Sequence, residues 1–311
     1  MTEIVNAAVA VLLREDGFVL LGQRPQGKSW AGWWEFPGGK IEAGETPYHA
    51  LQRELHEELG IEATAATPWL NRIFSYPERT VRLHFFSVRR WSGEPHGKEN
   101  QQLSWQHPAA PSVGPLLPAN VPVLEALKLP TQYAITNLAE MGETAFFAAL
   151  ERSLQHGLRL IQVREKQLER TELVGFAKSV IGLARHYGAR VVVNGDVEQA
   201  REAGTDGLHL SSAALMTCSG KPENLLCGAS CHNALELAHA AGLGMDYALL
   251  GAVQATRTHP TVQPLGWSKF AKLAANQPMP VYALGGMTPA DLHTAWEYGA
   301  HGVAMLRGVW K

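Results

Sequence analysis

Apolar residues in the first part of the chain occur in short runs that predict β-strands. Runs at 5–13 and 18–22 flank a turn at Asp16-Gly17, which is the pattern of a β-hairpin. Residues 120–129 have the pattern of a helix. Three further runs predict strands that complete a mixed sheet, and they lie at 69–76, 79–88 and 103–106.

The segment from Thr46 to Gly60 has the pattern of an amphipathic helix. Thr46 suits the N-cap position and Pro47 the first helical position, and no further Gly or Pro precedes Gly60. On a period of 3.6 residues the apolar side chains form one inward stripe, which consists of Ala50, Leu51, Leu55 and Leu59. Three carboxylates fall on another face within one turn, at Glu54, Glu57 and Glu58.

The pattern changes at Leu129-Pro130-Thr131, which predicts two domains, 1–129 and 130–311. Short apolar runs then alternate with amphipathic stretches, and this order predicts a parallel (β/α)₈ barrel. The strands are expected at 133–136, 158–163, 190–194, 207–210, 225–230, 246–251, 280–284 and 302–306. The helices are expected at 143–155, 171–187, 197–203, 233–242, 267–275 and 288–298.

The barrel is expected to lack its last helix, because the chain stops at Lys311. The outer face beside the last strand is then uncovered unless the other domain or another subunit packs there. A homo-oligomer is one arrangement that covers it.

Composition agrees with a cytoplasmic enzyme of two domains. The chain has 311 residues, of which 46% are hydrophobic, and a net charge of -2, so no surface for nucleic acid is indicated. Cys218, Cys227 and Cys231 have no paired framework and are expected to be reduced thiols. No signal peptide and no apolar run near 18 residues occurs, which argues against a membrane protein.

The three clustered carboxylates predict a metal site. Their mutual repulsion is relieved when cations fill the space between them, and hard oxygen donors suit Mg²⁺ or Mn²⁺. A solvated acidic helix face is the alternative, but Arg53, Glu45 and the Gly38-Gly39 turn are also in place. The spacing from Gly39 to Ile61 matches the Nudix box at every position. The segment therefore resembles the Nudix hydrolases, which cleave nucleoside diphosphates linked to another moiety.

Residues 1–129 resemble the MutT-like Nudix enzymes, which remove oxidised guanine nucleotides from the precursor pool. The similar segments are LGQRP, WWEFPGGKIEAGETP, YPERTVRLHFF, RRWSGEPHGKE and LPANVPVLEALKL. The resemblance implies an α/β/α sandwich with metal ligands at Gly38, Glu54, Glu57, Glu58 and Glu99. It also implies that Arg53 belongs to the catalytic group and that the nucleotide is bound by Arg24, Phe36, Arg79 and Asn120.

The chemistry of Asn120 supports a role in base recognition. Its amide has one acceptor and two donors in a plane, so it can distinguish an 8-oxo edge, where N7 is a donor, from guanine, where N7 is an acceptor. The N-cap of the helix that follows is an equally good interpretation, and both roles can coexist. Trp30, Trp33 and Trp34 are expected to pack in the core, with one of them free to stack on a purine.

Residues 133–307 resemble the thiamine phosphate synthases and their TenI-like relatives. The similar segments are YAIT, IQVREK, VVVNGD, DGLHLS, GASCHN, DYALLGAV, TRTHP, ALGGMTP and GAHGVAML. Polar residues follow the predicted strands, where such barrels keep their sites, and they are Arg164, Glu165, Lys166, Asn194, His209, His232, Gly285 and Gly286.

The barrel departs from the synthases where those enzymes hold Mg²⁺. Asp196 is displaced by one residue after Asn194, and Ala213 and Ala214 stand where acidic residues are expected. Too few hard ligands remain for a pyrophosphate-activating Mg²⁺, so synthase activity is not expected. The TenI-like relatives instead tautomerise a thiazole carboxylate phosphate with a histidine at the position of His232, and a histidine moves protons near neutral pH. A hydrogen-bonded histidine at a strand end is the alternative.

The phosphate of such a ligand is expected at Gly285-Gly286, with Arg164, Lys166 and Asn194 around it. Arg307 replaces a small hydroxyl residue of the family, so a charged side chain can take part in phosphate binding.

Three functions fit the sequence. The first is a Mg²⁺-dependent 8-oxo-dGTP diphosphatase that carries a barrel binding a thiazole or pyrimidine phosphate. In the second, the Nudix site hydrolyses thiamine-pathway pyrophosphates. In the third, the barrel only regulates or scaffolds the hydrolase.

Overall fold

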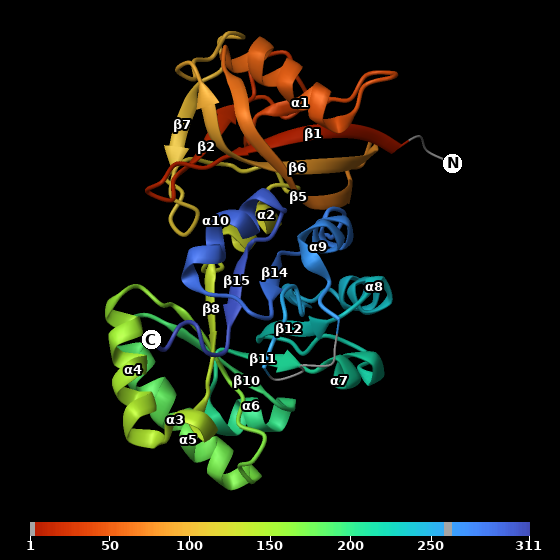
Figure 1. The fold of residues 1–311 in the computed structure, drawn as a ribbon. Helices are drawn as coiled ribbons and strands as arrows, with labels where there is room; N and C mark the ends of the chain where they lie inside the picture. Colours follow the sequence, from red (N-terminus) through yellow and green to blue (C-terminus); the bar gives the residue numbers. More distant parts are fainter. Residues whose placement is uncertain (1–3, 258–262) are drawn as a thin grey trace. The chain divides into compact units, whose positions relative to one another are not determined.

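The computed structural model describes residues 4–257 and 263–311, and it separates into two compact units, Met1–Leu129 and Pro130–Lys311 (Figure 1). Thr258, His259 and Pro260 of the TRTHP segment lie outside the described residues.

In the N-terminal unit, residues 4–129 form two sheets and two α-helices. A four-stranded sheet has the order β4-β1-β6-β5, in which β1 and β6 are parallel and the other pairs antiparallel. A three-stranded antiparallel sheet has the order β3-β2-β7. The elements are β1 (Ile4–Leu12), β2 (Val19–Gln23), β3 (Trp34–Glu35), β4 (Gly38–Lys40), α1 (Pro47–Glu54), β5 (Glu62–Ser75), β6 (Thr80–Ser92), β7 (Leu103–Gln106) and α2 (Val121–Leu127).

Strand β1 is buried on both faces, and this confirms the expected α/β/α sandwich. Successive side chains of a strand point to opposite faces. Ala8 and Ala10 pack in one cluster with Leu51 of α1, while Val9 packs in a second cluster with Val123 of α2. The predicted inward stripe is fully buried: Ala50 and Leu51 lie on α1, and Leu55 and Leu59 lie on the turn that follows it.

The predicted mixed sheet is present as β4-β1-β6-β5, but the predicted hairpin is wrong in its pairing. The turn forms, with the Arg14 amide donating to the Phe18 carbonyl at 3.0 Å, but Leu13 and Val19 make just an isolated bridge. Strand β1 instead pairs with β6 over nine residues, while β2 and β7 belong to the other sheet. The apolar pattern identifies strands, whereas their partners depend on distant contacts.

The C-terminal unit is a closed barrel of eight parallel strands, as predicted. The strands follow the chain in order from β8 to β15, and β15 pairs with β8. They are β8 (Gln132–Ile135), β9 (Leu160–Val163), β10 (Arg190–Asn194), β11 (Gly207–Leu210), β12 (Leu226–Cys231), β13 (Tyr247–Gly251), β14 (Val281–Leu284) and β15 (Gly302–Met305).

Helices follow seven of the eight strands among the described residues, so the barrel lacks its last helix. Two short helices were not predicted, α3 and α7, because four and six residues are too few for a periodic pattern. The helices are α3 (Leu138–Met141), α4 (Glu143–Gln155), α5 (Arg170–Arg185), α6 (Val197–Ala203), α7 (Ser212–Thr217), α8 (Ala234–Gly242), α9 (Gly266–Ala274) and α10 (Leu292–Glu297), the last preceded by a 3₁₀ turn at Pro289–Asp291.

Among the residues described, no helix combines the length and apolar character that crossing a membrane requires. Cys218, Cys227 and Cys231 are free thiols.

Candidate functional site

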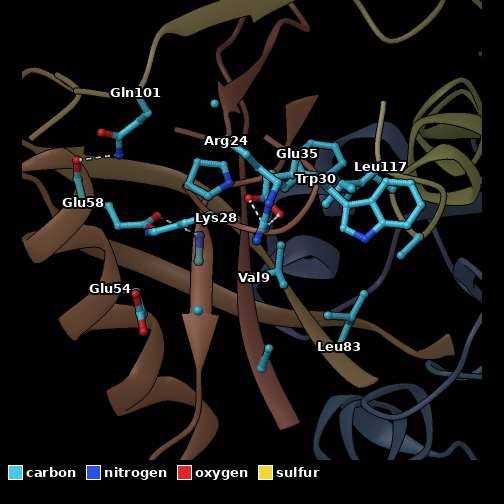
Figure 2. A pocket seen from close by; sticks show the side chains of 18 of the residues that line it. Val9, Arg24, Lys28, Trp30, Glu35, Glu54, Glu58, Leu83, Gln101 and Leu117 are labelled. Carbon is cyan, nitrogen blue, oxygen red and sulfur yellow. Dashed lines mark hydrogen bonds and ion pairs between the residues drawn. The ribbon is translucent and has the colours of Figure 1, made fainter. Parts of the chain in front are cut away.

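A cavity of about 390 Å³ in the N-terminal unit contains most of the predicted nucleotide and metal residues. Figure 2 shows Glu54 and Glu58 at one end of it and Trp30 and Leu117 at the other. The predicted residues that line it are Arg24, Phe36, Gly38, Glu54, Glu58, Arg79, Glu99 and Asn120. Arg53 and Glu57 do not line it.

The helix that carries the carboxylates changes its winding at the site. The hydroxyl of Thr46 accepts a hydrogen bond from the His49 amide, as expected for an N-cap. After Glu54, however, residues Leu55–Leu59 form a π-helical turn, which ends at Gly60 with φ of 68°. Such turns occur often at functional sites. Glu58 lines the cavity together with Glu54, while the side chain of Glu57 is 57% exposed.

Arg53 organises the carboxylates from behind the cavity. Its guanidinium binds Glu45 with two hydrogen bonds, of 2.8 and 3.0 Å, and lowers the pKa of Glu45 to about 2. The same group donates to Glu54 at 2.8 Å and to Glu57 at 3.1 Å. One cation therefore orients three carboxylates, which suits the planar fork of arginine.

Gly38 and Gly39 of β4 approach their neighbours closely, and the backbone contact of Gly38 leaves no room for a side chain. A Cβ atom on Gly38 would lie 2.2 Å from the Ala8 carbonyl oxygen, and one on Gly39 would lie 2.3 Å from the Glu54 carboxylate. The Gly38 amide donates to Glu58 at 3.2 Å. Burial, with Glu54 nearby, nevertheless raises the pKa of Glu58 to about 7. The backbone thus packs against carboxylates whose negative charge is not fully balanced by neighbouring positive groups.

The donor set suits a hard divalent cation, although its oxygens are not yet gathered around one point. No group of three acidic, histidine or cysteine side chains forms a ready ligand set within the described ranges. Each carboxylate is engaged separately: Glu54 by Arg53, Glu58 by the Gly38 amide, and Glu99 by Lys28 at 2.5 Å. Glu54, Glu58, Glu99 and the Gly38 carbonyl would hold Mg²⁺ or Mn²⁺ once these separate contacts give way to the metal.

The opposite end of the cavity offers an aromatic wall and buried polar groups. Trp30 lines it and lies 5.6 Å from Tyr76 between ring centroids, whereas Trp34 is a core residue, so one tryptophan of the three faces the cavity. The side chain of Asn120 is almost buried and makes no capping hydrogen bond with α2, although the residue occupies the N-cap position. The Nε atom of Arg79 is buried without a hydrogen-bond partner among the described residues.

Two residues of this cavity were not identified from the sequence. Glu35 binds Arg24 through both carboxylate oxygens, at 2.5 and 2.7 Å, and burial raises the pKa of Glu35. Lys28 projects from the loop between β2 and β3 and binds Glu99. An acidic residue inside the apolar WWEF run was a signal for Glu35, whereas a lysine in a loop gives none.

The mouth of the barrel forms a larger cavity of about 790 Å³. It brings together all the barrel residues predicted to contact a ligand, which are Arg164, Lys166, Asn194, His232, Gly285 and Gly286. Glu165, predicted with them, turns away and accepts a hydrogen bond from the Leu138 amide at 2.8 Å. Lysines and arginines line the mouth, whereas no Asp or Glu among the described residues does.

The two histidines of the barrel have different environments. The Nδ1 atom of His232 lies 2.8 Å from the Gly251 carbonyl, which can only accept, so Nδ1 is the donor and Nε2 is the nitrogen that can exchange a proton with a ligand. His209 was expected at the mouth, but it is fully buried inside the barrel, next to Ser230 and Tyr247. Burial lowers the pKa of His209 to about 3, so the imidazole stays neutral. Its contacts are with other side chains inside the barrel.

Arg307 also lines the mouth, where it makes a two-pronged ion pair with Glu140 of α3. Gly285 and Gly286 face it with positive φ angles of 101° and 73°. A Cβ atom on Gly285 would lie 2.6 Å from Ala252, so this turn also depends on glycine.

Comparisons with known proteins agree with both halves of the structure. The family model of the NUDIX domain matches residues 4–127, and that of thiamine monophosphate synthase (TMP-TENI) matches residues 132–309. The chain belongs to both families: its N-terminal unit is a Nudix hydrolase domain acting on phosphoanhydride bonds, and its C-terminal unit is a barrel of the thiamine monophosphate synthase family.

Three relatives illustrate the similarity. An 8-oxo-dGTP diphosphatase of Haemophilus influenzae is 40% identical over 125 residues, which are 40% of this chain and 92% of the relative. A CTP pyrophosphohydrolase of Escherichia coli is 42% identical over 38% of this chain and 87% of its own length. A putative thiamine-phosphate synthase of Aquifex aeolicus is 33% identical over 57% of this chain and 96% of its own length.

Replacing Arg53 with lysine tests its organising role. Lysine keeps the charge but cannot bind three carboxylates in fixed geometry, so we expect Arg53→Lys to lower kcat at least about tenfold with little change in thermal stability. Arg72→Lys on β5, outside the cavity, is the control. Steady-state kinetics and calorimetric melting measure the two quantities. Wild-type turnover in Arg53→Lys would show that its geometry does not matter.

Proposed function

We propose that the N-terminal site is a Mg²⁺-dependent nucleoside triphosphate pyrophosphohydrolase that prefers 8-oxo-dGTP and releases 8-oxo-dGMP and pyrophosphate. This reaction removes an oxidised precursor before DNA synthesis. The main support is Asn120, which lines the same cavity as Glu54 and Glu58. Its side chain is almost buried and makes no capping hydrogen bond with α2. A relative with the corresponding activity is 40% identical over this unit.

In this proposal one end of the cavity binds the metal and the phosphates, and the other end binds the base. When bound, the metal supplies positive charge to the phosphates and activates the attacking water. Arg53 keeps Glu54 and Glu57 oriented, and Glu58 accepts a hydrogen bond from Gly38 that fixes its carboxylate. At the base end Glu35 holds Arg24 in place, so that Arg24 reaches the nucleotide in one orientation.

Alternative substrates of this site remain candidates because the relatives differ. One of them is a CTP pyrophosphohydrolase, and a barrel of thiamine chemistry in the same chain favours thiamine-pathway pyrophosphates. Kinetics of the full chain with 8-oxo-dGTP, dGTP, CTP and hydroxymethylpyrimidine pyrophosphate separate these options. A kcat/KM for either of the last two above that for 8-oxo-dGTP would contradict the proposal.

The metal requirement predicts the behaviour of Glu58→Gln. Glutamine has the same shape but no charge, so we expect kcat to fall at least about 10²-fold and Mn²⁺ binding to weaken. Removal of divalent cations from the wild type should abolish turnover. Glu62→Gln, on the exposed start of β5, is the matched control. Full activity of Glu58→Gln, or of the metal-free wild type, would remove the metal assignment.

The base-reading role predicts a change in selectivity for Asn120→Ala. Loss of matched hydrogen bonds costs about 1–3 kcal/mol, so the preference for 8-oxo-dGTP over dGTP should fall about tenfold or more. The ratio of the two kcat/KM values is the measurement. Equal losses on both substrates would mean that Asn120 supports the fold and does not read the base.

For the barrel we propose binding of a thiazole or pyrimidine phosphate at the strand C-terminal mouth, with proton transfer by His232 as its chemistry. Three observations support it: the Nε2 atom of His232 that can exchange a proton, the Gly285-Gly286 turn, and a mouth lined by basic residues. A barrel that only scaffolds the hydrolase is the alternative. The cytoplasmic location and a homo-oligomer stay predictions.

Calorimetric titration of the full chain tests the barrel proposal. Thiazole phosphate carboxylate or hydroxymethylpyrimidine phosphate should bind without Mg²⁺, and Arg164→Ala should weaken that binding at least about tenfold, because Arg164 lines the mouth and pairs with phosphate. Arg170→Ala is the control, since Arg170 pairs with Asp196, Glu198 and Glu202. Absence of binding would leave the scaffold alternative, and Mg²⁺-dependent thiamine phosphate formation would refute the metal-free interpretation.

A further inference from the structure

An ion pair connects two loops across the metal end of the N-terminal cavity. Lys28 lies in the loop between β2 and β3, and Glu99 lies in the loop between β6 and β7. Their nitrogen and oxygen are 2.5 Å apart, and the two side chains are 49% and 44% exposed. Both residues line the cavity together with Glu54 and Glu58.

The partner of Glu99 differs from the partners of the other carboxylates. Arg53 is fixed by Glu45 and by the Lys40 carbonyl, and the Gly38 amide belongs to the backbone, so both can stay when a metal binds. Lys28, in contrast, has a long flexible side chain. Within the described part of the chain its ion-pair partner is Glu99. A divalent cation that takes Glu99 therefore displaces the Lys28 ammonium and leaves its charge without a partner.

We infer that Lys28 is an exchangeable counter-ion, which neutralises Glu99 until the metal arrives and then binds the polyphosphate of the nucleotide. This role rests on the proposed metal-dependent hydrolysis. Lys28 would be a positioning residue that couples metal binding to nucleotide binding, because the metal frees the ammonium and the nucleotide gives it a new anion. Nucleotide should then strengthen metal binding, and metal should strengthen nucleotide binding by the same factor.

The loop that carries Lys28 is suited to this exchange. Arg24 holds the backbone of this loop through two hydrogen bonds. The Nε atom of Arg24 donates to the Ser29 carbonyl at 2.7 Å, and the Arg24 carbonyl accepts from the Gly32 amide at 2.9 Å. The loop backbone can therefore stay in place while the Lys28 side chain changes its partner. Trp30, two residues further along, lines the base end of the same cavity. One short loop thus contacts both ends of the proposed nucleotide site.

Mn²⁺ binding measured by electron paramagnetic resonance tests this inference directly, without turnover. Titrations are done on the full chain, first alone and then with saturating α,β-methylene-dGTP, which lacks the oxygen bridge to be cleaved. The variants are Lys28→Met, which removes the charge, and Lys28→Arg, which keeps it. Lys98→Met is the matched control, because Lys98 is next to Glu99 in sequence but donates to the His56 carbonyl at 3.1 Å.

Without nucleotide, Lys28→Met should bind Mn²⁺ more tightly than wild type, by up to about fivefold, since a half-exposed ion pair no longer competes. With the analogue this advantage should disappear, so that the nucleotide-dependent gain in Mn²⁺ affinity is smaller than in wild type. Lys28→Arg should retain most of the gain, and Lys98→Met should match wild type.

Equal Mn²⁺ affinities and equal gains for wild type and Lys28→Met would overturn the role of Lys28 while leaving the proposed hydrolase intact. Equal effects of Lys28→Met and Lys98→Met would also overturn it, because they would reflect general charge. Failure of the wild type to bind Mn²⁺ with or without the analogue would instead refute the proposed metal site.

Discussion

The N-terminal site depends on the crowding of like charges on one short stretch of helix. Glu54, Glu57 and Glu58 lie within five residues, and burial together with the negative charge of Glu54 raises the pKa of Glu58 to about 7. Arg53 offsets part of the repulsion on the outer side, through its contacts with Glu54 and Glu57. The inner side remains short of positive charge, and this deficit is what a divalent cation would fill. Gly38 and Gly39 bring the backbone close to Glu58 and Glu54, which would hold that cation.

Local features of the Nudix helix could be predicted from the sequence, whereas its winding could not. The Thr46 cap and the buried stripe through Leu55 follow from residue types and a period of 3.6. The change to π-helical winding after Glu54 adds one residue to a turn, and this leaves the apolar pattern almost unchanged. Strand pairing failed for a related reason: the runs that became β1 and β2 were recognised, but their hydrogen-bond partners lie far away in sequence.

The candidate residues also differ in whether their role follows from local sequence or from a distant partner. Positions in fixed motifs, such as Glu58 and Gly285, could be named because their spacing is preserved. Lys28 and Glu35 were missed because their importance comes from a partner in space, Glu99 in one case and Arg24 in the other. His209 shows the opposite error, since a polar residue near the end of a strand can point into the barrel as readily as toward its mouth.

The two cavities differ in the charge of the side chains that line them, and this difference favours different ligands. The N-terminal cavity gathers three carboxylates at one end, where a cation would stand between them and the phosphates of a nucleotide. The barrel mouth is lined by Arg164, Lys166, Arg257, Arg307 and Lys311, and within the described part of the chain by no carboxylate. A phosphate can bind there directly, and a divalent cation would be repelled. Ala213 and Ala214, which stand where the resemblance to the synthases leads us to expect acidic residues, therefore favour the proposed binding of a free phosphate over that of a metal-bound pyrophosphate.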